Sequence, residues 1–454
     1  MKLTKYLMTG ALLAAVPALG LAQEATEAAE AAEDIGAAGL AALNTEMVFI
    51  FNSLLFLIGG LLVFWMAAGF AMLEAGLVRS KNVTMQLTKN VALFSLAAFF
   101  YYLIGFNLMY PGDAWMMEGW IGALGTTVLE AVGIGADEAV DVEYASVGSD
   151  FFFQLMFCAT TASIVSGTLA ERIKLNPFLV FVVILTALIY PIQASWTWGG
   201  GWLDAAGFSD FAGSTIVHSV GGWAALTGAL ILGPRVGRYR DGRTIPMPGS
   251  NLALATLGMF ILWMGWFGFN GASQLAMGTI GDVADVSRIF ANTNAAAAGG
   301  AIAAMLLTML LYKKPDLTMI LNGALAGLVS ITAEPLTPGL GLSTFIGAIG
   351  GVVVVLAVPM LDKLKIDDVV GAIPVHLIAG IWGTLAVVLS NGDASLGGQL
   401  TGIIATGIFV VITSGIVWFV LKAVVGLRVD RETEINGLDM AELGMEAYPD
   451  FTKG

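Results

Sequence analysis

The sequence predicts an all-α protein that crosses a membrane many times. Of its 454 residues, 57% are hydrophobic and only 12% are charged, whereas about 25% are charged in a soluble domain. The apolar residues gather in stretches of about 20 residues, the length of helix that spans a hydrocarbon core. The 57 glycines fit this class, because helices in lipid pack through close backbone approach at small residues.

The chain is expected to begin with a cleavable signal peptide over residues 1–22. Lys2 and Lys5 precede a mostly apolar run that ends in the small-residue pattern Gly20-Leu21-Ala22. A first transmembrane helix is the alternative, but this run is too short to span a membrane. The remaining parts are expected to be a polar periplasmic segment (23–46), a membrane domain (47–423) and a cytoplasmic C-terminal tail (424–454).

Eleven membrane-spanning helices are predicted from the apolar stretches. Their approximate bounds are Met47 to Leu73, Asn90 to Leu108, Phe152 to Leu169, Pro177 to Gln193, Thr215 to Leu232, Leu252 to Phe269, Asn292 to Tyr312, Leu317 to Ala333, Ser343 to Met360, Val369 to Ser390 and Thr401 to Leu421. Lys and Arg in short loops accumulate on the cytoplasmic side. With the N-terminus outside, the outward loops contain only Arg288, so we expect a cell inner-membrane protein whose C-terminus is cytoplasmic.

The outward loop over residues 111–150 is acidic and contains no Lys or Arg. An acidic outer face raises the local concentration of cations. Simple solubility of an exposed loop explains the same composition, and the sequence leaves both interpretations open.

The chain has only two histidines, and both fall inside predicted spans. Ionisable side chains at membrane depth are rare and usually line a pathway. The segments Asp210-Phe-Ala-Gly-Ser-Thr-Ile-Val-His218 and Asp368-Val-Val-Gly-Ala-Ile-Pro-Val-His376 share Asp, Gly, Val and His at the same offsets. The predicted topology sends them into the membrane from opposite sides, as an inverted-topology repeat would require.

This repeat predicts the depth of both histidines. If each Asp lies near a helix start, where a carboxylate can cap free N–H groups, each His lies about 12 Å deeper. Entering from opposite faces of a core about 30 Å thick, both imidazoles reach the midplane. Two histidines at one depth could share a proton or a substrate.

Other chemistries for this chain receive little support. Two histidines are too few for a metal site, no H-E-x-x-H or G-x-S-x-G pattern indicates a hydrolase, and the single Cys158 allows no disulfide framework. The net charge of −14 also argues against nucleic-acid binding. We therefore expect neither an enzyme nor a bound cofactor or metal.

Aromatic residues gather at the expected outer mouth. Trp198 lies just before the Asp210 segment, and Phe269 and Ser273 close the sixth span on the same side. Aromatic faces attract a cation within about 6 Å, so Trp198, with Phe153 or Phe157 and the Ser273 hydroxyl, could form a small cation site. The alternative is the belt of aromatic residues found at membrane interfaces.

At these residues the sequence resembles the ammonium transporter family (Amt/Mep/Rh), in its bacterial Amt form, from the first span to the tail. The Asp210 to His218 segment resembles the family signature. The resemblance is supported by Glu74-Ala-Gly-Leu-Val-Arg-Ser-Lys-Asn82, Gly167-Thr-Leu-Ala-Glu-Arg172 and Trp266-Phe-Gly-Phe-Asn270. Several ordered motifs over most of a chain make a chance match improbable.

The resemblance implies eleven helices, built as a five-plus-five inverted repeat plus a C-terminal helix, and a role for each matching residue. Trp198, Phe157 and Ser273 would recruit ammonium, with Asp210 as the buried carboxylate that shapes the site. Phe153 or Phe157 with Phe269 would form a hydrophobic gate, and His218 with His376 the pore pair. The partners implied are ammonium or ammonia, with methylammonium as a further substrate, membrane lipid, and two more copies of the chain in a homotrimer.

The tail from Glu434 to Tyr448 resembles the tail through which family members contact a PII-type regulatory protein. It departs from the family at Leu443-Gly-Met445, where many members have His-Gly-Glu. The alternatives within and outside transport are a Rh-like channel for neutral gas, a carrier of another small amine, and a sensor of ammonium. For a sensor we would expect a signalling domain, and only about 30 residues follow the last span.

Overall fold

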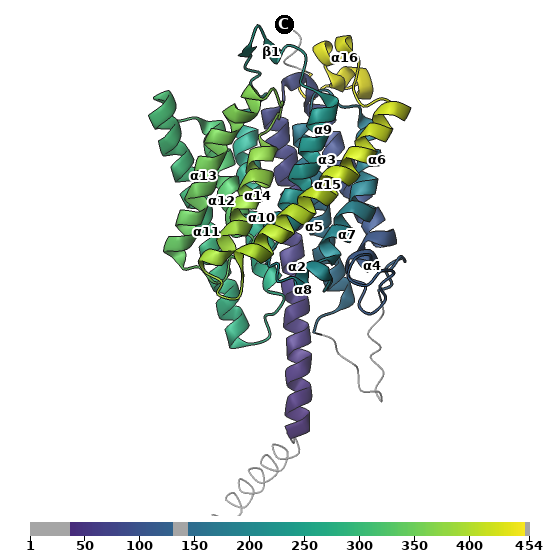
Figure 1. Ribbon diagram of the computed structural model, residues 1–454, viewed down its shortest axis with the longest axis vertical. Helices are drawn as coiled ribbons and strands as arrows, with labels where there is room; N and C mark the ends of the chain where they lie inside the picture. The colour runs from purple at the N-terminus through teal and green to yellow at the C-terminus, as the bar shows by residue number, and fades with distance from the viewer. Residues whose placement is uncertain (1–36, 130–143, 450–454) are drawn as a thin grey trace, which may run out of the picture.

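The computed structural model describes residues 37–129 and 144–449. The expected signal peptide, most of the polar segment and part of the acidic loop lie outside the described residues. The described chain forms a bundle of long helices that run roughly along one direction, with α15 crossing it obliquely (Figure 1). The polypeptide is therefore all-α apart from one short hairpin, β1 (Tyr239–Arg240) and β2 (Arg243–Thr244).

The helical elements follow one another in this order: α2 (Ala37–Leu77), η1 (Ser80–Asn82), α3 (Val83–Phe100), η2 (Tyr101–Gly105), α4 (Phe106–Met109), α5 (Val147–Thr168), α6 (Leu175–Ile184), η3 (Leu185–Ile189), α7 (Tyr190–Ser195), α8 (Trp202–Ala205), η4 (Ser214–Ser219), α9 (Val220–Leu232), α10 (Leu252–Gly271), η5 (Ala272–Gln274), α11 (Ile280–Tyr312), α12 (Leu317–Ile331), α13 (Leu340–Lys363), η6 (Ile373–Ile378), α14 (Ala379–Ala386), η7 (Val387–Leu389), α15 (Leu396–Val424), α16 (Arg431–Asn436) and η8 (Asp439–Leu443).

All eleven predicted stretches are helical. Within the described residues, nine continuous helical segments are long and apolar enough to cross a membrane, and two shorter apolar ones span Leu317–Ile331 and Ile373–Leu389. Several of these segments change from α to π geometry along their length, as α6, η3 and α7 do. The chain is thus a multi-pass membrane protein with nine long candidate spans.

The predicted start of the seventh span is wrong. The seventh span was expected to begin near Asn292, with Arg288 in the preceding loop, but α11 begins at Ile280 and Arg288 lies within it. The Thr279 side chain accepts a hydrogen bond from the Asp282 N–H while the Asp282 carboxylate accepts one from the Thr279 N–H. This capping box starts the helix about three turns before its apolar stretch, so hydropathy misses the start.

Small residues bring the helices close together, as their abundance predicted. A Cβ atom at Gly347 or Gly351 of α13 would overlap the backbone of Ala296 or Gly300 on α11. Such close backbone approach is the usual basis of helix packing in lipid.

The two ends of the bundle differ. At one end, here called the tail end, lie the β1–β2 hairpin and α16, while α8 lies at the opposite end, here called the far end (Figure 1). The tail is fastened to the tail end by Asp439, whose carboxylate accepts hydrogen bonds from the N–H groups of Thr84 and Met85 at the start of α3. Arg428 also forms an ion pair of 2.8 Å with Glu434.

Candidate functional site

The centre of the bundle is organised by the two segments that run from an aspartate to a histidine. In the first, the Asp210 carboxylate accepts four backbone hydrogen bonds of 2.7–3.0 Å, from Gly213, Ser214, Thr215 and Ile216. These are the N–H groups that the start of a helix leaves without partners. Asp210 therefore fixes where η4 begins, and with it the position of His218.

The second segment repeats this arrangement. The Asp368 carboxylate accepts hydrogen bonds from the N–H groups of Gly371 and Ile373 and from the Thr168 hydroxyl, at 2.7–3.2 Å. Each aspartate thus lies at a helix start, which is the condition on which the predicted depth of the two histidines rests.

Each histidine lies in a π-helical turn, a feature that no local sequence pattern predicted. His218 belongs to η4 and His376 belongs to η6, and each turn continues directly into an α-helix. A π-turn inserts one extra residue, rotates the side chains that follow, and is often found at functional sites. Here it turns both imidazoles toward the same place.

Two glycines allow the segments to cross closely. Gly222 and Gly380 each lie four residues after a histidine. A Cβ at Gly222 would lie 2.8 Å from the Leu377 backbone nitrogen, and one at Gly380 would lie 2.5 Å from the Ser214 carbonyl oxygen. Both distances are far below van der Waals contact, so larger residues would separate the two segments and with them the histidines.

At this crossing the histidines meet. The Nδ1 atoms of His218 and His376 are 3.1 Å apart, a hydrogen bond, and both side chains are buried. One Nδ1 must therefore carry a proton while the other accepts it. An imidazolium in this apolar setting would be costly, so the pair is neutral with one proton between its facing nitrogens.

The second ring nitrogen of His218 lacks a hydrogen-bond partner among the described residues. His218 Nε2 is buried and makes no hydrogen bond within the described part of the chain. The rings of Trp266 and Phe269 stack on the imidazole at centroid distances of 5.0 and 5.3 Å. Since buried polar atoms are almost always hydrogen-bonded, this nitrogen is available to a small polar molecule in the path.

Toward the far end lies a cavity of about 330 Å³, here called the aromatic cavity. Its lining residues are Tyr110, Tyr144, Asp150, Phe153, Gln154, Phe157, Trp198, Phe211, Ser273 and Leu275. The structure therefore brings together in one cavity the predicted Trp198, Phe153, Phe157 and Ser273. Ser273 donates its hydroxyl proton to the Phe269 carbonyl at 2.7 Å, so its oxygen can still accept a hydrogen bond from a ligand.

Trp198 links the aromatic cavity to the first aspartate. Its indole Nε1 donates a hydrogen bond of 2.9 Å to the Asp210 carbonyl. The Phe157 ring meets the Trp198 ring edge to face at 6.0 Å. Asp210 itself does not line the cavity, and its carboxylate is directed at the helix start behind it.

Two phenylalanine rings lie between the aromatic cavity and His218. The rings of Phe157 and Phe269 lie at a centroid distance of 4.1 Å and an angle of 32°, and both residues are buried. Phe153 lies behind Phe157, at 4.7 Å, and does not stack on Phe269 in the ring contacts of the described residues. Of the two candidates that the sequence left open, Phe157 is the one whose ring contacts Phe269, and the gate itself stays a prediction.

Sequence reasoning missed five polar or aromatic residues of the aromatic cavity. They come from three separate segments and are Tyr110, Tyr144, Asp150, Gln154 and Phe211. Asp150 was noted only as part of an acidic loop. Its position at the first turn of α5, where its carboxylate accepts a hydrogen bond from the Gln154 side chain, could have distinguished it from the rest of that loop.

Toward the tail end, His376 borders a small cavity of about 20 Å³, here called the histidine cavity, which Phe70, Glu74, Ser163 and Asn322 also line. It adjoins a larger cavity of about 160 Å³, here called the tail-side cavity. The two share Asn322, Val370 and Gly371 among their lining residues. Cavities therefore lie on both sides of the histidine pair.

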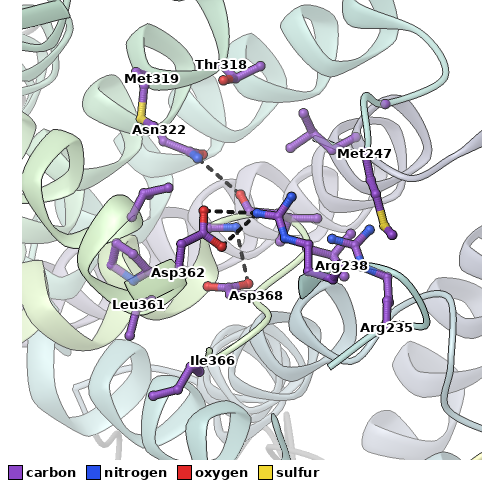
Figure 2. A pocket seen from close by; sticks show the side chains of 17 residues that line it. Arg235, Arg238, Met247, Thr318, Met319, Asn322, Leu361, Asp362, Ile366 and Asp368 are labelled. Carbon is purple, nitrogen blue, oxygen red and sulfur yellow. Dashed lines mark hydrogen bonds and ion pairs between the residues drawn. The ribbon is translucent and has the colours of Figure 1, made fainter. Parts of the chain in front are cut away.

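The tail-side cavity is lined by more charged residues than the aromatic cavity. Figure 2 shows Arg238 pointing at Asp362 across it, with Asn322 and Asp368 nearby; the Arg238–Asp362 ion pair measures 2.8 Å.

Two carboxylates that do not line this cavity also pair with its Arg235. Burial would raise the pKa of Glu171, but the guanidinium groups of Arg235 and Arg79 lower it. Burial likewise opposes ionisation of Asp367, yet hydrogen bonds from Arg235 hold the pKa of this carboxyl well below its usual range.

Comparison with known proteins identifies the family. Residues 54–448 match the model of the Ammonium Transporter Family. The chain is 42% identical over 426 residues to ammonium transporter Amt2 of Archaeoglobus fulgidus, covering 87% of each chain. It is 36% identical over 409 residues to the ammonium transporter of Bacillus subtilis, covering 86% of this chain and 96% of that one.

Solved structures agree. A structure named Sensor Amt Protein matches with a TM-score of 0.80 at 33% identity, covering 88% of this chain and 99% of that one. Mep2 of Candida albicans matches with a TM-score of 0.74 at 26% identity, covering 87% and 90%. With a family model over most of its length and relatives above one-third identity, this multi-pass membrane protein belongs to the ammonium transporter family.

Proposed function

We propose that the protein conducts ammonium through the route formed by the aromatic cavity, the histidine pair and the two cavities toward the tail end. The observation that carries this proposal is the unpartnered His218 Nε2, buried beneath the Phe157–Phe269 stack. A polar atom kept without a partner at the centre of a membrane bundle is favourable only if a ligand supplies the missing hydrogen bond.

The aromatic cavity would recruit the substrate as NH4+. The faces of Phe157 and Trp198 attract a cation, and the Ser273 oxygen can accept one of its N–H groups. Asp210 would act indirectly, by fixing the start of η4 and, through its carbonyl, the indole of Trp198. Methylammonium would enter the same site as a larger substrate.

Ammonium would lose a proton before it reaches the histidines. A bare cation between stacked phenylalanines is expensive to desolvate, whereas neutral ammonia can pass Phe157 and Phe269 and hydrogen-bond to a neutral imidazole. Potassium has no proton to lose, so the same route excludes it. The facing Nδ1 atoms of the pair offer one position at which a proton could be passed on.

We further propose that eleven segments cross the membrane, the nine long ones and the two shorter apolar ones, as a five-plus-five inverted repeat with α15 outside it. The matching aspartate caps, π-turns and crossing glycines of the two histidine segments support this repeat. The N-terminus would lie outside the cell, after removal of residues 1–22, and the tail end would face the cytoplasm of an inner membrane.

The assembly would be a trimer with one route in each protomer. The tail, held at the tail end by Asp439, is placed where a cytoplasmic PII-type protein could contact it. Binding of a PII protein to membranes that contain the chain, tested over nucleotide conditions, checks this proposal. Absence of binding under every condition would remove it.

The decisive experiment records the current evoked by an ammonium pulse across proteoliposomes of the purified protein. Potassium pulses and an exposed-site variant, Asp393→Asn, serve as controls. We expect a current for ammonium but not for potassium, and its loss, or loss of selectivity, in His218→Ala and His376→Ala. No current, together with ammonia flux equal to that of empty liposomes, would overturn the transport proposal.

A sensor is the second candidate, because one of the matching structures is named Sensor Amt Protein. A sensor would bind ammonium at the aromatic cavity without moving it. Ammonium-dependent stabilisation of the protein against heat, combined with no flux above empty liposomes, would favour this candidate over transport.

A further inference from the structure

A buried carboxylate on the tail-end side of the histidine pair has no part in the route proposed above. Glu74 lies near the end of α2, is 1% exposed, and lines the histidine cavity together with His376. Taking an ionised carboxylate out of water is costly unless its oxygens are paired. The hydrogen bonds of each Glu74 oxygen therefore decide whether its burial is compensated.

Only one of its two oxygens is saturated. Glu74 Oε2 accepts hydrogen bonds from the side chains of Gln86, Asn90 and Ser166, at 2.5–3.0 Å. Glu74 Oε1 accepts none from the described residues. Three donors therefore share one oxygen of a residue that lines the histidine cavity, while no hydrogen bond from the described residues reaches the other oxygen.

The nearest buried cation does not complete the pair. Lys89 Nζ donates to Gln86 Oε1 at 3.0 Å and to the Ser166 carbonyl at 2.9 Å, and lies over the Phe178 ring. Within the described ranges, no ion pair joins Lys89 to Glu74. Lys89 lowers the energy of the carboxylate through space but leaves Oε1 without a donor.

The histidine cavity has the size and lining of a site for one small cation. Its volume of about 20 Å³ suits one particle the size of water, since about 10–15 Å³ is enough for one. Besides Glu74 it offers the Ser163 hydroxyl oxygen, which donates its proton to Ala159 and can still accept. It also offers the ring of Phe70, and Asn322, whose amide nitrogen donates to the Val370 carbonyl and leaves its oxygen free to accept.

We propose that the histidine cavity is an ammonium-binding subsite on the tail-end side of the histidine pair, with Glu74 Oε1 as its charged acceptor. Ammonium suits it because each N–H can meet a different acceptor while the charge faces a carboxylate and an aromatic ring. The inference rests on the proposed function and adds a second ammonium position, separated from the aromatic cavity by Phe157, Phe269 and both histidines.

The test measures the carboxylate stretching band by infrared difference spectroscopy of the full-length protein in membranes, with ammonium chloride against potassium chloride. Glu74→Gln keeps the shape of the side chain and removes its charge. Its matched control is Glu171→Gln, which makes the same chemical change at a buried glutamate whose ion pairs with Arg79 and Arg235 leave no role for ammonium.

We expect an ammonium-dependent shift of a carboxylate band that is lost in Glu74→Gln and kept in Glu171→Gln. Methylammonium carries an extra methyl group into a cavity suited to one water-sized particle and should produce a smaller shift. Ser163→Ala should raise the ammonium concentration at half-maximal shift about threefold to tenfold, the effect of one lost hydrogen bond. This variant keeps the test decisive if Glu74→Gln does not fold.

A shift that persists in Glu74→Gln, or a half-maximal concentration unchanged by Ser163→Ala, would overturn the inference. Neither result depends on transport. If wild-type proteoliposomes carry current and the Glu74 band does not respond to ammonium, the subsite is wrong and the proposed route stands. If the band responds and no flux is found, the subsite stands and transport fails.

Discussion

The two segments that end in His218 and His376 follow the same local design in different surroundings. Asp210 is 3% exposed, and its two carboxylate oxygens accept hydrogen bonds from four backbone N–H groups. Asp368 is half-buried and accepts hydrogen bonds from two backbone N–H groups and one hydroxyl. Asp368 also lines the charged tail-side cavity (Figure 2). The same local arrangement therefore gives a more deeply buried segment at the far end and a segment beside a charged cavity at the tail end.

The sharpest test of this difference removes each carboxylate in turn. Asp210→Ala leaves four buried backbone N–H groups without a hydrogen-bond acceptor, so we expect it to lower the free energy of unfolding by about 4 kcal/mol or to prevent folding. Asp368→Ala strands fewer donors beside a cavity that water can enter, and we expect about 2 kcal/mol. Thermal unfolding in detergent measures both, with the exposed Asp204→Ala as control. Equal losses would show that the two segments are energetically equivalent.

Acid should weaken the tail end through its ion pairs. The pKa of Glu171 is lowered in the folded protein by Arg235 and Arg79, so its stabilisation is complete above the unfolded value of about 4.3. It is lost as pH falls through the lower folded value. We expect the melting temperature to fall as pH drops below about 4, and Glu171→Gln to cost about 3 kcal/mol at neutral pH.

The test of the ion pairs of Glu171 is the slope of melting temperature against pH. Glu171→Gln should flatten the acid dependence of the melting temperature, because the group that titrates is gone. An unchanged slope in this variant would assign the acid sensitivity to other carboxylates, with Asp367 as the next to test because Arg235 lowers its pKa too.

A smaller effect is expected at the glycine that precedes each π-turn. Gly213 has φ of 107° and Gly371 has φ of 82°, a region that costs other residues about 1–2 kcal/mol. In Gly371→Ala the new Cβ would also lie 2.5 Å from Asn322 Nδ2, at the border of both tail-end cavities. We therefore expect similar losses of stability, but a fall in ammonium flux beyond that loss only in Gly371→Ala.

Flux per folded protein, set against melting temperature, checks this prediction. In Gly213→Ala the new Cβ would meet Val217 and Trp198 instead, so a change should appear in the concentration for half-maximal flux rather than at the tail end. The reverse pattern would contradict the assignment of the two glycines to opposite ends of the route.

The same comparison shows what sequence could and could not reveal. The spacing of Asp, Gly, Val and His predicted two related segments with histidines at similar depth, because helix rise is a local property. The π-turns were not predictable, since they depend on packing where the segments cross. Phe211 of the aromatic cavity was missed for the same reason: contacts between distant segments leave no local period in the sequence.

Hydropathy located the helices better than their ends. It found every apolar stretch but missed the first turns of α11, where the capping box of Thr279 and Asp282 starts the helix outside the apolar region. The partner of Phe269 was likewise undecided between Phe153 and Phe157, which lie four residues apart on one face of α5. Only the ring contact between Phe157 on α5 and Phe269 on α10 distinguishes the two.

The smallest expected effect isolates the one partner that the two aspartates do not share. The Thr168 hydroxyl donates to Asp368 at 3.0 Å, whereas the hydrogen bonds that Asp210 accepts within the described chain all come from backbone N–H groups. Thr168→Val keeps the shape and removes this donor, which we expect to cost about 1 kcal/mol.

Thr160→Val is the matched control, because Thr160 lies on the same helix and its hydroxyl donates only within α5, to the Met156 carbonyl. If Thr168 fastens α5 to the Asp368 segment, amide hydrogen exchange in Thr168→Val should rise at Gly371 and Ile373 and stay unchanged at Gly213 and Ser214. Equal increases in both segments would mean that they open as one unit. The difference in their surroundings would then have no consequence for their dynamics.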